Sequence, residues 1–232
     1  SIENHFDKSF ELEATLEKRL QRKALKEIID ISKLNIYMQS IRQVEAKGLG
    51  HAILCAKRLV GNEPFAIVLP DMLISKKNGN AGDSLKKMRL SFEKQEIPSV
   101  LLGRAKKADI PKYGIAQIKK HSKLPGLGLI EKIIEKPTIK KAPSNLYAAG
   151  RYIFNNDFFK YLSKVKPDKS NEIQLTDAIA DYIKDGKKVS AFPLEGNIFD
   201  CGDNAEYILA NLEFAMKDPV MKTKIKNYLK TR

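Results

Sequence analysis

Short apolar segments alternate with amphipathic segments along most of this chain, and this alternation restricts the fold more than any other feature. Strand-like runs are predicted at residues 35–41, 65–70, 99–104, 113–118, 127–137, 147–154 and 189–194. Helical spacing of apolar residues is found over residues 50–60, 83–95, 156–165, 173–186 and 204–218. The alternation predicts an α/β fold, with a mainly parallel mixed sheet that helices cover on both faces.

The size of the chain is compatible with one domain. Its 232 residues, 43% of them hydrophobic, are enough for one large α/β core, and we predict a single domain over residues 1–232. Residues 2–30 carry apolar side chains at helical spacing among charged ones, which predicts an amphipathic helix broken near residues 7–9.

The charge of the chain limits its partners. The 42 Lys and Arg against 28 Asp and Glu give a net charge of +14, which favours a polyanionic partner. The lysines are scattered, without a basic helix or aromatic residues interleaved with arginines, so we expect a solvated surface and neither nucleic acid nor a membrane as partner. No apolar run of about 18 residues and no signal-peptide pattern occurs, which predicts a cytoplasmic protein. Cys55 and Cys201 lack the spacing of a zinc site or a disulfide framework.

Two carboxylates follow predicted strands, at the ends where sheets of this kind bind ligands. Asp71 comes after the buried-type run FAIVLP, and Asp200 ends the run NIFD. Mg²⁺ prefers hard oxygen ligands together with substrate phosphates, so two such acids can share one metal ion. Each carboxylate, taken alone, also fits the capping of a turn.

A segment with two glycines, RQVEAKGLGHAILCA, follows the first predicted strand. Gly48 and Gly50 at a helix entrance let the backbone approach a flat ring or a phosphate, and the Gln43 amide offers a donor and an acceptor that match a pyrimidine edge. The segment has neither the GxGxxG dinucleotide fingerprint nor a Walker lysine. We expect His51 to be a structural, hydrogen-bonded histidine rather than a catalytic one.

The strand-like run LGLIEKIIEKP ends in a carboxylate and an ammonium group. Glu135 suits hydrogen bonds from sugar hydroxyls, and Lys136 suits the neutralisation of phosphate charge. Adjacent strand residues point to opposite faces, so both reach one ligand only where the strand ends, and Pro137 supplies such an ending. A solvated charge pair is the alternative. Gly114 and Gly150 are isolated strand glycines, which mark either a bulge or a close approach to a ligand.

In chain order, the segments IENHFD, RQVEAKGLGHA, LPD, YGI, EKP, APSNL, GRY, EIQLTDAI and DCG resemble the bacterial UTP:glucose-1-phosphate uridylyltransferases. The resemblance is colinear from Ile2 to at least Glu213. EKP is shared by sugar nucleotidyltransferases in general, whereas GLGHA, APSNL, GRY and EIQLTDAI together are specific to the uridylyl branch. The resemblance implies a Rossmann-like, three-layer nucleotidyltransferase fold.

The resemblance implies a nucleotide half of the site. Gln43 and the backbone around Gly48 and Gly50 would hold the uracil of UTP. Asp71 would bind Mg²⁺ beside the sugar, and Asp200 would be the second carboxylate at the metal.

The resemblance also implies a sugar half and a reaction. Gly114, Glu135 and Gly150 would line the glucose pocket, and Lys136 would contact the phosphates. A glucose-1-phosphate oxygen would attack the α-phosphorus of UTP in line, releasing pyrophosphate and giving UDP-glucose. Lys136 and Asp71 would be the catalytic residues, and no covalent enzyme intermediate is required.

Three further expectations follow from the resemblance. The family begins with a strand and a phosphate-binding loop that have no counterpart before Ser1, so the chain is predicted to be N-terminally incomplete relative to the family and inactive alone. The alternatives are a non-catalytic remnant or regulatory subunit that binds sugar nucleotide, and a sister enzyme that uses dTTP or another sugar-1-phosphate. The resemblance finally implies a homo-oligomer.

Overall fold

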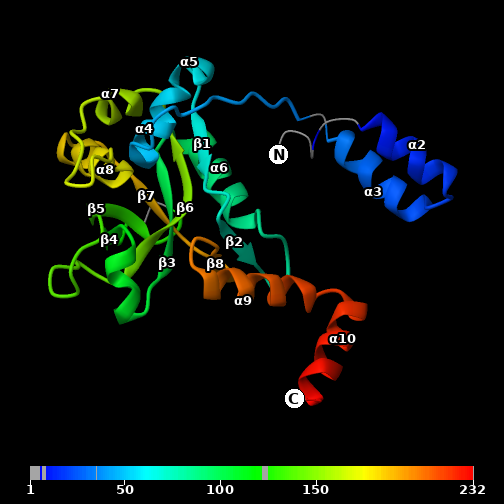
Figure 1. The fold of residues 1–232 in the computed structure, drawn as a ribbon. Coiled ribbons are helices and arrows are strands. Elements are labelled where there is room, and N and C mark those ends of the chain that lie inside the picture. Colours follow the sequence, from blue (N-terminus) through cyan, green and yellow to red (C-terminus); the bar gives the residue numbers. More distant parts are fainter. Residues whose placement is uncertain (1–5, 7–8, 35, 122–124, 232) are drawn as a thin grey trace. The chain divides into compact units, whose positions relative to one another are not determined.

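The computed structural model describes residues 6, 9–34, 36–121 and 125–231, which divide into two compact units, Ser1–Arg42 and Gln43–Arg232 (Figure 1). In the first unit, helices α2 (Phe10–Lys18) and α3 (Arg22–Ser32) pack against each other. The predicted N-terminal helix is therefore confirmed, with Ser9 non-helical before α2, within the predicted break. A second break, which was not predicted, lies at residues 19–21, where Leu20 has a left-handed backbone with φ 54°. Residues 7 and 8 of the predicted break lie outside the described residues. The single domain over residues 1–232 stays a prediction.

The second unit contains a six-stranded sheet, in the order β1-β6-β3-β7-β5-β4, and a separate two-stranded ribbon, β2-β8. The strands are β1 (Phe65–Val68), β2 (Met72–Ser75), β3 (Ser99–Arg104), β4 (Ile115–Lys119), β5 (Gly128–Ile134), β6 (Leu146–Phe154), β7 (Ser190–Pro193) and β8 (Asn197–Asp200). No strand forms over residues 36–41, where the sequence predicts one, because these residues are exposed and have no partner strand.

The helical segments of this unit follow the predicted pattern. They are α4 (Gly48–Cys55), α5 (Lys57–Val60), α6 (Asp83–Gln95), the 3-10 helix η1 (Lys107–Lys112), α7 (Phe158–Leu162), α8 (Leu175–Lys184), α9 (Asn204–Ala215) and α10 (Pro219–Lys230). In the part of the chain that the structure describes, no helix is both long and apolar enough to cross a membrane.

The strand directions correct one prediction. Among the described strands only β3 and β7 pair in parallel, whereas the sequence predicts a mainly parallel sheet. The long strand β6 runs antiparallel to β1, β3 and β4, which accounts for half of the pairings in the large sheet. The apolar run in β1 predicts a strand buried on both faces, but β1 ends the strand order, and Ala66 and Val68 are exposed. The α/β class with a mixed sheet is confirmed.

Helices cover both faces of the large sheet, giving three layers (Figure 1). Successive strand residues point to opposite faces, so each central strand supplies apolar side chains to both cores. The face under α7 and α8 buries Val100, Leu102, Ala148, Tyr152 and Phe154, and the face under α6 buries Leu101, Tyr147, Ala149 and Ile153. Central strands buried in this way form a rigid support for residues at their ends.

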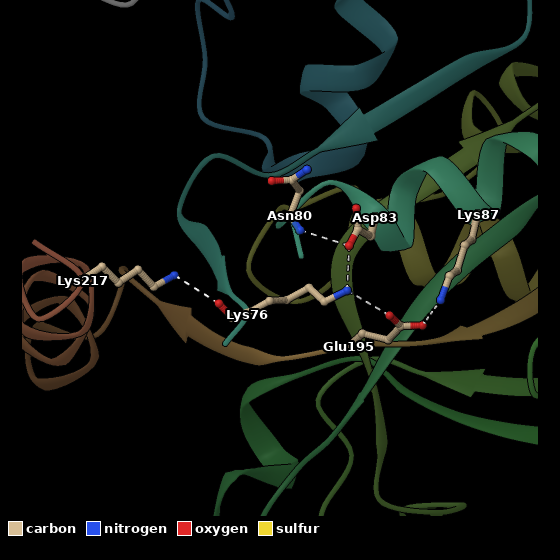
Figure 2. A network of polar contacts seen from close by, with 6 residues as sticks. All are labelled: Lys76, Asn80, Asp83, Lys87, Glu195 and Lys217. Carbon is tan, nitrogen blue, oxygen red and sulfur yellow. Dashed lines mark hydrogen bonds and ion pairs between the residues drawn. The ribbon is translucent and has the colours of Figure 1, made fainter. Parts of the chain in front are cut away.

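The far end of the β2-β8 ribbon is fixed by a polar network (Figure 2). The Lys76 side chain, which is 12% exposed, forms ion pairs with Asp83 of α6 at 2.8 Å and with Glu195 at 3.0 Å. Glu195 also pairs with Lys87 of α6, and Lys217 Nζ donates to the Lys76 carbonyl over 3.4 Å. A buried ammonium group needs such partners, so the network ties the ribbon to α6 at the end away from its two aspartates.

Candidate active site

The β2-β8 ribbon brings the two predicted metal-site carboxylates together. Asp71 directly precedes β2, and Asp200 ends β8, opposite Met72 in the antiparallel register. The backbone N–H of Cys201 donates to the carbonyl of Asp71 over 2.8 Å. Two carboxylates that are far apart in sequence therefore lie at the same end of one ribbon.

This pair of carboxylates fits the chemistry of magnesium rather than that of a closed metal cage. Among the described residues, no group of three His, Cys, Asp or Glu side chains is placed to hold a metal ion. Mg²⁺ keeps several waters and is usually bound by one or two carboxylates plus substrate phosphates. Asp71 is exposed and Asp200 is partly exposed, so both are open to such a ternary arrangement.

Tyr113 connects Asp200 to the strand ends on the other side of the site. Tyr113 and Asp200 line the same cavity, and burial together with the Asp200 charge raises the pKa of Tyr113 above its usual 10. The Tyr113 ring stacks on Tyr147, with 4.7 Å between the ring centroids. The sequence analysis did not single out Tyr113, and the available signal was its position directly before Gly114.

The end of β5 places Glu135 and Lys136 on one side. Lys136 has a left-handed backbone with φ 40°, and its N–H donates to the Tyr113 carbonyl over 3.1 Å. Lys136 Nζ consequently lies 4.0 Å from Oε1 of Glu135. The predicted strand ending is confirmed, and it lets both side chains face one ligand.

Glu135 is held by Thr176, the second residue of α8, which the sequence analysis missed. Thr176 Oγ1 donates to Oε2 of Glu135 over 2.8 Å, leaving Oε1 near Lys136. A Cβ on Gly114 would lie 2.5 Å from Cγ2 of Thr176 and 3.0 Å from Oε2 of Glu135. Any larger residue at Gly114 would therefore displace the carboxylate. Thr176 belongs to the EIQLTDAI segment, and its place in that segment was the only signal for it.

Gly150 lies against the turn that carries Asp71. It adopts φ 68°, and a Cβ there would lie 2.9 Å from Cγ of Met72. Its carbonyl accepts a hydrogen bond from Leu69 N–H over 2.9 Å. The close approach predicted for this glycine is made by the β1-β2 turn of the chain itself.

The entrance of α4 holds the third group of predicted residues. Gln43 Nε2 donates to the Gly48 carbonyl over 3.1 Å and lies 2.8 Å from Nδ1 of His51. A hydrogen-bonded His51, as predicted, is confirmed. Within the described residues nothing donates to Oε1 of Gln43, so this oxygen can accept from the N–H of a pyrimidine ring.

Gly48 and Gly50 are required by a loop of the chain itself. Gly48 has φ 80°, and a Cβ on it would lie 2.8 Å from Cβ of Glu172. A Cβ on Gly50 would lie 2.5 Å from the carbonyl oxygen of Ile173, which already accepts the Gly50 N–H over 2.9 Å. The loop that leads to Thr176 in α8 is thereby docked on the start of α4, so the Gln43 region and the Glu135 region are linked.

We expect Gly50→Ala to lower the free energy of unfolding by about 1–3 kcal/mol, because the new methyl group overlaps a backbone oxygen that cannot move freely. Gly82→Ala is the matched control, since a Cβ there has nothing within 4 Å, and it should stay within about 0.5 kcal/mol of the wild type. Urea unfolding measures both. Equal midpoints for the two variants would show that the Ile173 loop does not pack on α4.

Comparison with known proteins bears on the family of this chain. The family model described as Nucleotidyl transferase matches residues 9–217. The UTP--glucose-1-phosphate uridylyltransferase of Haemophilus ducreyi is 40% identical over 219 residues, which cover 94% of this chain and 74% of that protein. The protein of the same name from Escherichia coli K12 is 38% identical over 231 residues, covering 99% and 76%.

Solved structures agree with these relatives. The UTP-bound UGPase from Acinetobacter baumannii is 33% identical and superposes with a TM-score of 0.84, covering 98% of this chain and 77% of that one. A UDP-glucose pyrophosphorylase complexed with UDP-glucose is 36% identical with a TM-score of 0.79, covering 94% and 77%.

Proposed function

Because this chain belongs to the UTP:glucose-1-phosphate uridylyltransferases of the nucleotidyl transferase family, we propose that the strand ends around Tyr113 form its sugar-nucleotide site. The family reaction transfers UMP from UTP to glucose-1-phosphate and gives UDP-glucose and pyrophosphate. One observation carries the site assignment: Tyr113 lines one cavity with Asp200, and its carbonyl accepts the Lys136 N–H over 3.1 Å, so the carboxylate pair and the Glu135–Lys136 pair belong to one region.

In the proposal, Asp71 and Asp200 hold Mg²⁺ together with the phosphates of the substrate. Magnesium, when bound, neutralises part of the phosphate charge and favours attack on phosphorus. Lys136 contributes a second positive charge from the opposite side. Its side chain is 56% exposed and, among the described residues, makes only the long 4.0 Å ion pair with Glu135, so it can turn toward a phosphate.

Glu135 is the proposed acceptor for the sugar hydroxyls. Thr176 fixes Oε2, and the absence of a side chain at Gly114 lets Thr176 and that oxygen lie together, which leaves Oε1 available to a ligand. At the α4 end, Oε1 of Gln43 is proposed to accept from uracil N–H while Nε2 is held by Gly48 and His51. Uracil would thus be bound at the start of α4 and the sugar beside Glu135, and the Gly50–Ile173 hydrogen bond connects these two regions.

Glu135→Gln is expected to raise stability at neutral pH while weakening the binding of UDP-glucose. Burial raises the pKa of Glu135 above its ordinary 4.5, so the folded chain holds this proton more tightly than the unfolded chain does. The ionised carboxylate therefore destabilises the folded state as pH rises above 4.5, and the neutral amide removes that penalty. Thermal unfolding at about pH 7.5 should give a higher Tm for the variant, with the difference vanishing at about pH 4.

The same variant should bind UDP-glucose roughly 10–100-fold more weakly in calorimetric titration, because charge-assisted hydrogen bonds are worth about 1.5–3 kcal/mol. A lower Tm for the variant at neutral pH would contradict the burial argument. An unchanged affinity for UDP-glucose would show that Glu135 does not bind the sugar.

Pyrophosphate release from UTP with glucose-1-phosphate and Mg²⁺ tests the proposed site, with dTTP and ATP as competing nucleotides. Because the chain is predicted to be inactive alone, the assay compares it with a form extended upstream by contiguous coding sequence. In the active form we expect the rate with UTP to exceed the rates with dTTP and ATP, and chelation of Mg²⁺ to abolish it. A faster reaction with dTTP would favour the sister-enzyme alternative. Binding of UDP-glucose without any turnover would favour a non-catalytic sugar-nucleotide binder.

We also infer a homo-oligomer, since α9 and α10 expose large apolar side chains. Tyr207, Ile208, Val220, Tyr228 and Leu229 are each more than half exposed. Light scattering of the wild type and of Ile208→Asp tests this proposal: the substitution should reduce the molar mass. The cytoplasmic location stays a proposal.

A further inference from the structure

The guanidinium group of Arg151 clamps the turn that carries Asp71. Nη1 donates to the carbonyls of Leu69 and Gly150, each over 3.0 Å, and Nη2 donates to the carbonyl of Met72 over 2.8 Å. Leu69 and Met72 lie on either side of Asp71 in the sequence, so a single side chain bridges the turn from its entrance to its exit. A planar fork of donors suits such bridging, whereas a lysine offers a single nitrogen.

The other hydrogen bonds of this turn among the described residues come from the backbone, including the bond from Met72 N–H to the Leu69 carbonyl over 3.4 Å. Leu69 N–H donates to the Gly150 carbonyl over 2.9 Å, and Cys201 N–H donates to the Asp71 carbonyl over 2.8 Å. These bonds continue the neighbouring strands and do not depend on side chains. Arg151 is therefore the place where a substitution can loosen the Asp71 turn while the sheet around it keeps its hydrogen bonds.

The charge of Arg151 is placed unusually for an arginine. It is partly buried and forms no ion pair with a carboxylate in the part of the chain that the structure describes. A partly buried guanidinium group needs hydrogen-bond partners, and the carbonyls of Leu69, Met72 and Gly150 supply them.

We propose that Arg151 is a positioning residue for the transfer reaction, which holds the Asp71 turn in the geometry that metal binding requires. The inference rests on the proposed role of Asp71 as a metal ligand. It goes beyond that role because it assigns the positioning of Asp71 to Arg151, a residue of β6. Groups that orient a metal ligand affect metal affinity even though they never touch the metal.

Mn²⁺ binding, followed by electron paramagnetic resonance in the presence of UDP-glucose, tests the inference without relying on turnover. Arg151→Met is expected to raise the Mn²⁺ dissociation constant by roughly 10–100-fold, and to lower kcat by a similar factor with little change in the KM for UTP. Arg151→Lys keeps the charge and should lose less Mn²⁺ affinity and less kcat than Arg151→Met. The lysine variant also provides the test if the methionine variant folds poorly.

Ser144→Ala is the matched control. Ser144 Oγ donates to the Ala116 carbonyl over 2.5 Å and accepts the Leu146 N–H over 2.8 Å, so the substitution removes a side-chain clamp on backbone elsewhere in the same sheet. It should lower Tm without changing Mn²⁺ affinity. Wild-type Mn²⁺ affinity in both Arg151 variants, or an equal loss in Ser144→Ala, would overturn the inference. Failure of the underlying metal role is distinguished by Asp71→Asn, which would then leave Mn²⁺ affinity unchanged.

Discussion

Asp71→Asn is expected to lower the turnover of UDP-glucose synthesis by roughly 10²–10³-fold, the usual loss when one group that stabilises the transition-state charge is removed. The Asp71 carboxylate is exposed and makes no hydrogen bond or ion pair among the described residues. Its replacement therefore removes no interaction from another residue of the fold. The asparagine keeps the shape and removes the charge. Steady-state kinetics with varied Mg²⁺ should show a reduced kcat and a higher Mg²⁺ requirement.

Asp185→Asn is the control for this charge change, because Asp185 is exposed and caps the end of α8 remote from Thr176. It should keep wild-type kinetics. If Asp71→Asn retained turnover within about threefold of the wild type, less than 1 kcal/mol of barrier would depend on this carboxylate and the metal assignment would be wrong.

Lys136→Ala should lower turnover by roughly 10²–10³-fold as well, for a different reason. The side chain is 56% exposed, and its only ion-pair partner among the described residues is Glu135 at 4.0 Å, so the fold loses almost no interaction. Its charge matters when two polyanions are brought together, and the loss should be largest in kcat. Product formation measured by phosphorus NMR avoids dependence on a coupled assay.

Lys132→Ala removes the same charge from an exposed position of β5 and should be neutral. Lys136→Arg should recover part of the lost rate, because it restores a positive charge with altered geometry. Near-normal synthesis by Lys136→Ala would refute its role at the phosphates, whatever its effect on stability.

Local pattern predicted much of the fold because helices and strands have different periods. The amphipathic spacing of residues 83–95 coincides with α6, and the apolar run 99–104 coincides with β3. Strand direction was not predictable in the same way, because an apolar run indicates neither which strand it pairs with nor whether the pair is parallel. The long strand β6 pairs antiparallel with β1, β3 and β4, and these pairings depend on contacts distant in sequence.

The same distinction between local sequence signals and long-range contacts applies to the site. Glu135 and Lys136 were predictable as a pair because a proline ends their strand, which is a local property. The need for glycine at Gly50 comes instead from Ile173, and the clamp by Arg151 acts on backbone carbonyls. Carbonyl partners are present at every residue, so a side chain that binds them leaves no mark in the sequence.

The central claim is that Asp71, Asp200 and Glu135 belong to one sugar-nucleotide site. A crystal structure of the protein with UDP-glucose and Mn²⁺, with the metal located by anomalous scattering, tests it most directly. We predict one anomalous peak about 2.0–2.2 Å from oxygens of Asp71 and Asp200, with the glucose hydroxyls bonded to Glu135. A peak that touches neither aspartate, or UDP-glucose bound away from Glu135, would contradict the account.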